Sequence, residues 1–390
     1  MDLAEFIYHA KKAYSIYPGV LHPVSGRFLH DHYVRRATVR GSVRLLLDAL
    51  VGLGFHAWIP WRARRVQRRF GLDDAWRSRA ERIAHARFAD PNDIALFRIE
   101  RAEELDGYIR RFEDAALNRI INAPGWTSGC VLADKVAFYR RCVAAGLPHP
   151  QVVATLSGNR VELISAPGDW PLLLKPARGE GGRGVAFLPS ASAMAGDPDA
   201  LTAWLSTVVP GRGGVWIVQR RLAAHANIVP LALHALTTAR ITTILNERGD
   251  PEPVSAVLRF ASDPVAQVDN MKAGGLLAPI DIASGALGLG CKGYGGGDYE
   301  RHPVTGASIA GFLLPDWQEA KALAVRAHHE AFGEYAMVGW DIGLSDVGPM
   351  LVEGNSKPGV LMPQRAGRAG LGGQRYGELL ALQLARKAAT

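Results

Sequence analysis

Cysteine is scarce in this 390-residue sequence, and its three residues, Cys130, Cys142 and Cys291, are odd in number and far apart. This spacing argues against a disulfide framework or a cysteine-based metal site, and it favours a reducing cytoplasm. The first residues lack a basic stretch followed by an apolar core, so we expect no secretory leader. Hydrophobic residues at 48% and charged residues at 21% are typical of a globular protein, and the length suits two or three domains.

Lysine is absent from residues 34–87, which carry thirteen arginines and four acidic residues, a net charge of +9 against +8 for the whole chain. A basic region on a nearly neutral body predicts an anionic surface or partner for that region only. Within it, the apolar run Leu45–Trp61 precedes five arginines and is shorter than the roughly 20 residues of a membrane span. Two interpretations remain: peripheral contact with an anionic membrane, or an amphipathic helix packed on the body. No nucleic-acid-binding motif accompanies the arginines, so a nucleic-acid partner is not expected.

The chain changes character near residue 120. Residues 1–118 show helical spacing with many charges, apart from Ala95–Ile99, which alternates like a strand. Short β-type runs and glycine-rich loops follow, with no internal repeat. We therefore predict an α+β protein with mixed sheets. Its parts are a helical, arginine-rich region (1–118), a part that contains the glycine loop (119–218) and a part with the later strands (219–390).

The segment Gly339–Gly359 contains two short strands around a turn. Asp341 lies in the first strand, and Glu353 and Asn355 share one face of the second because side chains repeat every two residues. A hairpin would bring all three together as oxygen ligands, which suits Mg²⁺. Alternatively, they are ordinary polar residues at the ends of a hairpin.

A second group of residues suits phosphate binding. The apolar strand that ends at Lys175 runs into the glycine-rich stretch 179–184, whose backbone N–H groups can approach an anion. Lys175 would supply a point charge, although a flexible hairpin with a solvated lysine is the alternative. The lysine precedes the glycines, so this is not a P-loop. Asp134 is a candidate helix N-cap, and Lys135 opposes the helix dipole there, which hints at a role outside the helix. A solvated lysine is the default alternative for Lys135.

Two further strands carry candidate ligands. The strand ending at Gln219 leads into an extended link whose backbone can read an adenine edge, or which simply connects sheet and loop. Arg240, in the strand that starts near Thr238, can hold a phosphoryl group or a carboxylate with two hydrogen bonds. A surface ion pair is the alternative for Arg240.

In their order along the chain, these features resemble the ATP-grasp superfamily. The finer pattern is similar to the sugar-transfer-associated subgroup and covers roughly residues 125–385. The residues that carry it are Thr238–Thr243, Val268–Asn270, Gly274–Gly275, His302–Pro303, Thr305–Gly306, Pro315, Trp317 and Gly339–Asp341.

The resemblance implies two α+β subdomains that clasp ATP, and an ATP-dependent ligase. Such an enzyme activates a carboxylate as an acyl phosphate, with ATP and Mg²⁺ as cofactors, and couples it to an amine or thiol. It also implies roles for particular residues. For catalysis these are Arg240, Lys175 and Arg183; for ATP, Lys135, Lys175, Gly179, Gly181, Gly182, Gly184, Gln219, Arg220, Arg221 and Leu222; for substrate, Arg259, Asp269, Asn270, Gly274 and Gly275; for the metal, Asp341, Glu353 and Asn355. A structural strand arginine is the alternative for Arg259, and a turn with Asx chemistry is the alternative for the other substrate residues.

The front end departs from the family pattern. Many members carry a Rossmann-like domain before the ATP-binding part, whereas residues 1–118 read as helical here. We expect small-molecule carboxylate and amine substrates, but their identity is therefore not inferred from the resemblance. An ATP-grasp phosphotransferase acting on a hydroxyl, and a non-catalytic nucleotide-binding adaptor, remain alternatives.

Overall fold

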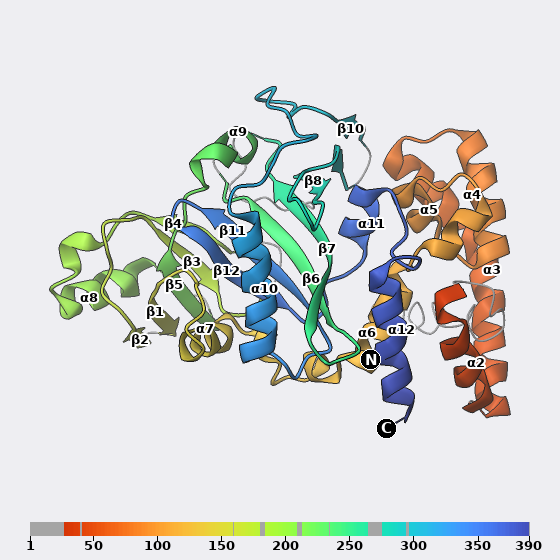
Figure 1. Ribbon diagram of the computed structural model, residues 1–390, viewed down its shortest axis with the longest axis horizontal. Helices are drawn as coiled ribbons and strands as arrows, with labels where there is room; N and C mark the ends of the chain where they lie inside the picture. The colour runs from red at the N-terminus through yellow and green to blue at the C-terminus, as the bar shows by residue number, and fades with distance from the viewer. Residues whose placement is uncertain are drawn as a thin grey trace.

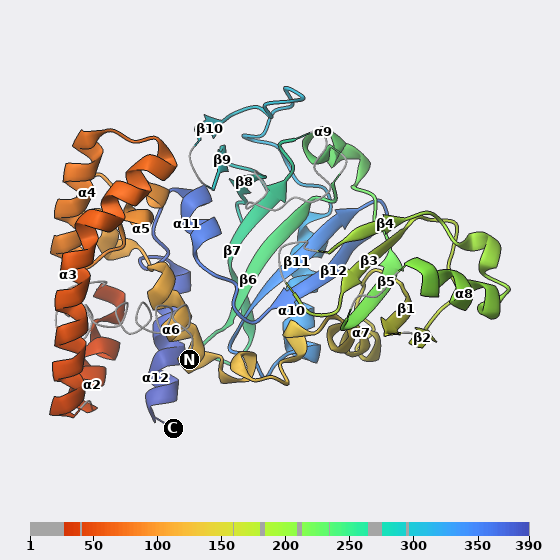
Figure 2. The same ribbon diagram turned by 180° about the vertical axis from the view of Figure 1, so that it is seen from behind.

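The computed structural model describes residues 27–39, 41–158, 160–179, 184–208, 213–233, 235–263, 275–293 and 296–389. A helical region lies at one end, a seven-stranded sheet in the middle and a five-stranded sheet at the other end (Figures 1 and 2). Short 3-10 helices connect the larger elements: η1 (Arg27–Leu29), η2 (Ala102–Gly107), η3 (Ala123–Trp126), η4 (Val131–Ala133), η5 (Ser192–Met194) and η6 (Ala226–Ile228).

The helical region contains α2 (His30–Val39), α3 (Ser42–Phe70), α4 (Asp74–Arg87), α5 (Pro91–Phe97) and α6 (Arg111–Ile121). The helix ends follow local rules: Gly71 ends α3 with φ of 64°, and the Asp73 carboxylate caps α4 by accepting from Trp76 N. Ile59, Val66, Ile83 and Leu96 belong to the core that joins α3, α4 and α5.

The strand predicted at Ala95–Ile99 is wrong, because α5 occupies most of it. Asp90 caps this helix through Asn92 N, and Pro91 stands at its first position, where proline favours helix initiation. All seven residues of α5 are buried, so its sequence does not show the polar face of an amphipathic helix. An apolar run buried on every side carries no periodicity that separates helix from strand.

The five-stranded sheet has the order β2-β1-β5-β3-β4. Helix α7 precedes it in sequence, and α8 packs against β2. The elements are α7 (Lys135–Ala144), β1 (Val152–Ser157), β2 (Arg160–Leu163), β3 (Leu172–Pro176), β4 (Ala186–Leu188), α8 (Pro198–Val208) and β5 (Val215–Arg220).

The seven-stranded sheet has the order β10-β9-β8-β7-β6-β11-β12, and α10 packs on it around the buried Trp340. Every strand pairing in the described part of the chain is antiparallel, so the predicted mixed sheets are wrong. The elements are α9 (Val229–Ala232), β6 (Thr238–Leu245), β7 (Pro251–Phe260), β8 (Leu276–Pro279), β9 (Gly290–Lys292), β10 (Asp298–Tyr299), α10 (Trp317–Ala331), β11 (Met337–Ser345), β12 (Gly348–Asn355), α11 (Leu361–Gly367) and α12 (Arg375–Ala389).

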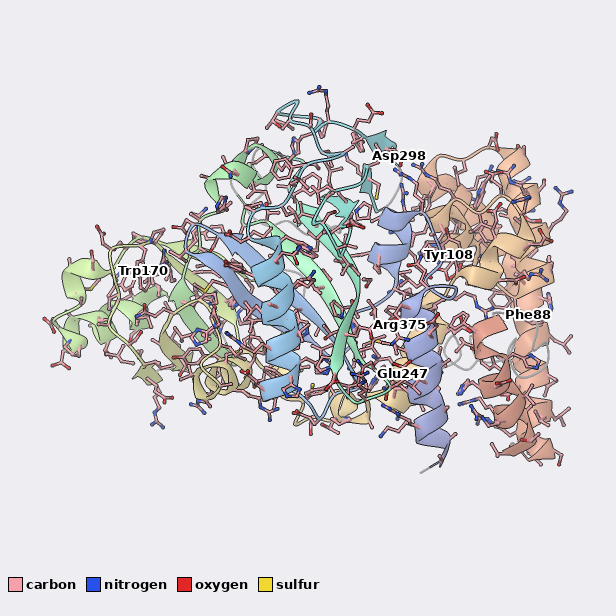
Figure 3. All side chains as sticks on the ribbon, in the orientation of Figure 1. Phe88, Tyr108, Trp170, Glu247, Asp298 and Arg375 are labelled. Atoms are coloured by element: carbon pink, nitrogen blue, oxygen red, sulfur yellow. The ribbon has the colours of Figure 1, made fainter. Side chains whose placement is uncertain are left out.

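The helical region is joined to the central sheet by buried polar contacts as well as by packing. The side chain of Gln364, in α11, accepts from Ile109 N and donates to Ile109 O, both at 2.8 Å. Near the top of this boundary, Asp298 pairs with Arg98 and Arg368 at 3.0 Å each (Figure 3). These contacts tie two halves of the chain that lie far apart in sequence.

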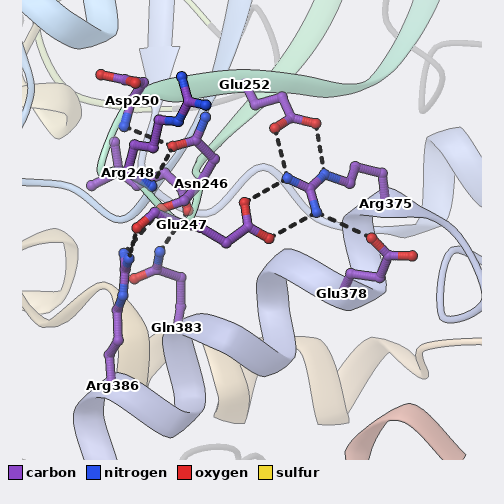
Figure 4. Close-up of polar contacts among 10 residues, drawn as sticks. Asn246, Glu247, Arg248, Asp250, Glu252, Arg375, Glu378, Gln383 and Arg386 are labelled. Carbon is purple, nitrogen blue, oxygen red and sulfur yellow. Dashed lines mark hydrogen bonds and ion pairs between the residues drawn. The ribbon is translucent and has the colours of Figure 1, made fainter.

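Arg375 fixes the start of α12 to the turn between β6 and β7. Its guanidinium forms ion pairs with Glu247, Glu252 and Glu378 at 2.7, 2.7 and 3.1 Å (Figure 4). One planar guanidinium satisfies three carboxylates because its donors point in a fixed fork. The α12 helix is thereby held against β6 and β7 of the central sheet.

Asp93 gives the helical region a pH-dependent stability. Burial, and then the neighbouring charge of Asp90, raise the pKa of the Asp93 carboxyl from 3.8 to about 7, although Arg111 N donates to it. The folded chain therefore binds more protons than the unfolded chain, so the free energy of unfolding falls as the pH rises from about 4 to about 7. Burial also raises the pKa of Asp114 to about 7, so we expect Asp93→Asn to reduce this fall rather than remove it, measured by denaturant unfolding at both ends of that range. An unchanged pH dependence in the variant would contradict the assignment.

Candidate active site

The β11–β12 hairpin brings the three predicted metal ligands to one place. Asp341 lies directly opposite Glu353, and Gly339 lies opposite Asn355, whose amide donates to Gly339 O at 3.4 Å. A bulge follows Asp341 in the pairing. Gly354 lies between the two ligands of β12 in close contact with the core, since a Cβ there would come within 2.6 Å of Leu132.

Two arginines on the neighbouring strands converge on Asp341. Arg240 stands opposite Asp341 in the β6–β11 pairing and holds both of its carboxylate oxygens. Arg259, from β7, donates to Oδ2 of Asp341 at 3.1 Å. Burial alone would raise the pKa of Asp341, but the charges and hydrogen bonds of Arg240 and Arg259 lower it to about 2. Asp341 is therefore a carboxylate near neutral pH, within a group that carries excess positive charge.

Lys175 approaches this group from the other sheet. It lies near the end of β3 and is buried, and burial lowers the pKa of its ammonium to about 8. The carboxylates of Glu353 and Asp341 act in the opposite direction, and Lys135 adds a smaller lowering effect. Lys175 belongs to the five-stranded sheet, and Glu353 and Asp341 belong to the seven-stranded sheet, so both sheets supply charged residues to the candidate site.

Lys135 is the first residue of α7, and its role at the phosphates stays a prediction. Nζ donates to Gly179 O at 2.9 Å, so the lysine contacts the start of the glycine loop. Asp134 is the predicted N-cap: its carboxylate accepts from Val136 N and Ala137 N. Asp134 also pairs with Arg178 at 3.1 Å, which links the helix start to the loop a second time.

The donor set fits Mg²⁺. No group of three or more His, Cys, Asp or Glu side chains suited to a metal occurs within the described residues. The predicted set instead combines two carboxylates with one amide oxygen. Mg²⁺ takes one or two protein carboxylates and keeps other positions for water and phosphate. Glu353 forms no hydrogen bond or ion pair with the part of the chain described, and Asp341 keeps lone pairs beyond those that the arginines use.

The predicted adenine-side link lies at the end of β5. Gln219 is buried, Arg220 pairs with Asp346 at 3.5 Å, and the guanidinium of Arg221 lies 4.3 Å from the centre of the Phe187 ring. The N–H groups of Arg220 and Arg221 are used by backbone carbonyls. Leu222 is buried beyond them. Reading of an adenine edge by this link stays a prediction.

Several predicted residues lie outside the described part of the chain, namely Gly181, Gly182, Arg183, Asp269, Asn270 and Gly274. Of the glycines that flank the loop, Gly179 and Gly184 adopt φ of 128° and 78°. Residues with a side chain rarely adopt such φ values, which explains glycine at these two positions. Gly275 is buried just before β8.

Asn122 is a supporting residue that sequence reasoning missed. Its amide donates to Met337 O at 2.8 Å and to Ser356 O at 2.7 Å, and its oxygen accepts from Ala336 N. It thereby holds the two ends of the β11–β12 hairpin together from the helical side. These contacts span more than 200 residues of sequence, so no local pattern could have revealed them.

The candidate site draws its lysine, arginine and carboxylate side chains from both antiparallel sheets, an arrangement that accords with the ATP-grasp class. The sequence matches the sugar-transfer associated ATP-grasp family over residues 121–376, about two thirds of its length, and the chain belongs to this family.

Solved structures with this fold are distant. D-alanine–D-alanine ligase from Bacillus anthracis is 13% identical, with a TM-score of 0.36, and the match covers 67% of this chain and 68% of the ligase. D-alanyl-alanine synthetase A from Vibrio cholerae is 12% identical, with a TM-score of 0.41 and coverages of 67% and 66%. An L-amino acid ligase from Bacillus licheniformis is 12% identical, with a TM-score of 0.32 and coverages of 58% and 40%. A comparison with curated proteins gives no significant match.

Proposed function

We propose that the protein is a Mg²⁺- and ATP-dependent ligase that activates a carboxylate as an acyl phosphate and couples it to an amine or thiol. The observation that carries this proposal is the convergence of Arg240 and Arg259 on Asp341, with Lys175 opposite. The site has three cationic side chains and two carboxylates. Its positive charge is therefore in excess, and it can attract further anions. Phosphoryl oxygens and a substrate carboxylate are anions that guanidinium groups bind well.

The protein side chains would act by position and charge. Lys175 and Lys135 would face the phosphates of ATP, and Arg240 would neutralise the group in transfer. Arg259 would orient the substrate carboxylate for in-line attack on the γ-phosphorus. An amine would then attack the acyl carbon and release phosphate. A bound Mg²⁺, held by Asp341, Glu353 and Asn355, would neutralise phosphate charge.

The substrate-side residues Asp269, Asn270, Gly274 and Gly275 belong to the same proposal as the wall of the acceptor site, together with Arg183 as a second cation near the transferring group. Within the domain plan, residues 119–218 would supply the lid over ATP, and 219–390 the metal ligands. A cytoplasmic site of action accords with the dependence on ATP.

Turnover of Mg·ATP against a panel of carboxylates and amines tests the proposal, with ADP and product mass measured in the same samples. We expect ADP only when both substrates are present, together with a condensed product. A phosphomonoester formed from one hydroxyl substrate would show a phosphotransferase instead. Tight nucleotide binding without turnover of any pair would favour the adaptor.

A further inference from the structure

The outer face of α3 is apolar and exposed over about five turns. Val43, Leu46, Leu50, Leu53 and Trp61 are 73, 63, 55, 66 and 55% exposed. These positions recur at helical spacing and define one stripe, called here the α3 stripe, which is about 27 Å long at 1.5 Å per residue. Such a continuous apolar surface marks an interaction site.

The opposite face of α3 is already occupied. Phe55, Ile59, Ala63 and Val66 are buried, and α3 packs on α4 and α5. In both views α3 and α4 form the outer end of the molecule, away from the two sheets (Figures 1 and 2). Among the helices in the described residues, α3 alone is long and apolar enough to cross a membrane, judged by its length and composition. Of its most apolar 18-residue stretch, 22% is buried inside the protein. The apolar run Leu45–Trp61 thus belongs to a longer helix than the sequence predicted.

Arginines lie at both ends of the α3 stripe. Arg44 lies in the first turn of α3, where it pairs with Asp48 at 3.8 Å, and Arg64, Arg65 and Arg68 continue the exposed face after Trp61. Trp61 marks the change from apolar to basic, with the guanidinium of Arg65 at 5.5 Å from its ring centre. Tryptophan beside arginine suits the boundary between lipid tails and headgroups, and the arginines complement anionic lipid.

We propose that the α3 stripe docks the protein on the surface of an anionic lipid bilayer, with the helix lying in the plane of the interface. The charge pattern favours lipid as the occupant. A protein groove that binds an apolar helix would not require positive charge at both ends of that helix, whereas an anionic lipid surface attracts it. The packed inner face, which includes the buried Asp48, keeps the helix attached to the protein, so α3 lies on the membrane and does not cross it. This proposal does not depend on the ligase reaction. It places the protein at a membrane surface, whatever reaction the protein catalyses there.

Co-sedimentation with vesicles tests this docking. The full chain is mixed with neutral phosphatidylcholine vesicles and with vesicles that also contain anionic phosphatidylglycerol. We expect binding to the anionic vesicles, release of the protein at high salt, and a loss of at least about tenfold in the combined variant Leu46→Ser, Leu50→Ser, Leu53→Ser. These leucines are exposed, so the variant should keep its circular dichroism spectrum and thermal unfolding. Leu313→Ser is the matched control, since this leucine is 65% exposed on the catalytic body.

Two further measurements separate lipid docking from other uses of the stripe. Arg64→Gln, Arg65→Gln and Arg68→Gln together should weaken binding to anionic vesicles and leave the monomer unchanged. Lipids brominated near the headgroup should quench Trp61, and the quenching should shrink in Trp61→Phe. The proposal is overturned if neither vesicle binds the protein, if the leucine variant binds as the original does, or if the stripe proves to hold a dimer together in the absence of lipid. Resistance to extraction by high salt would contradict a surface position.

Discussion

We expect replacement of Lys175 by methionine to lower the proposed ATP turnover sharply and to leave the fold intact. The ammonium is buried beside Glu353 and Asp341, and burial lowers its pKa to about 8. Loss of one preorganised charge at a phosphoryl-transfer site costs about 10²- to 10³-fold in rate. Methionine has similar volume and carries no charge that must be buried, so the melting temperature should not fall substantially.

Steady-state turnover, nucleotide binding and thermal unfolding should be measured together on Lys175→Met. Lys321→Met is the matched control, because Lys321 is a half-buried lysine of α10 whose ammonium donates to Ile282 O at 3.1 Å. The control should retain turnover. Retained turnover in Lys175→Met would remove this lysine from the site. If Lys175→Met loses both turnover and folding, the role of the positive charge is tested instead with Lys175→Arg, which keeps that charge.

The two candidate metal carboxylates should differ in their effect on stability when each is replaced by its amide. Glu353 forms no ion pair within the described residues, so Glu353→Gln should lose turnover by about 10²-fold or more, need a higher Mg²⁺ concentration, and unfold at the original temperature. Asp341 neutralises Arg240 and Arg259, with side-chain exposures of 7, 11 and 16%. Asp341→Asn should therefore also lose about 3 kcal/mol of stability, because it leaves the buried guanidinium of Arg240 without its carboxylate partner.

Turnover as a function of Mg²⁺ and denaturant unfolding, measured on both variants, check this difference. Glu330→Gln is the control, an exposed glutamate of α10 that pairs only weakly with Arg326 at 3.9 Å. Equal stability of Asp341→Asn and the original protein would contradict the burial of the pair. An unchanged Mg²⁺ requirement in Glu353→Gln would remove Glu353 from the metal site.

The core of the candidate site was accessible from sequence, because its residues lie at the ends of strands with strong patterns. Alternation along β12 predicted that Glu353 and Asn355 share a face, and the hairpin does place Asp341 opposite Glu353. The same reasoning found β3 and Lys175. The role of Arg259 was left open because its contact with Asp341 depends on the pairing of β6 with β7, which sequence alone does not determine.

Other features had no local signal. The β10 strand has two residues and β9 has three, too short to show alternation. Asn122 acts through contacts formed only after the helical region packs on the hairpin. The apolar run in α3 was compatible with membrane contact or with packing on the body. The position of its exposed stripe depends on which side of the helix α4 and α5 cover.

Transfer of oxygen from the substrate carboxylate to phosphate tests the proposed reaction most directly. The carboxylate substrate found in the turnover panel is labelled with ¹⁸O in its carboxyl group, and the phosphate released with ADP is analysed by mass. Attack of the carboxylate on the γ-phosphorus, followed by displacement by the amine, predicts one ¹⁸O atom in each phosphate released. Phosphate without ¹⁸O, formed together with ADP and product, would contradict activation through an acyl phosphate.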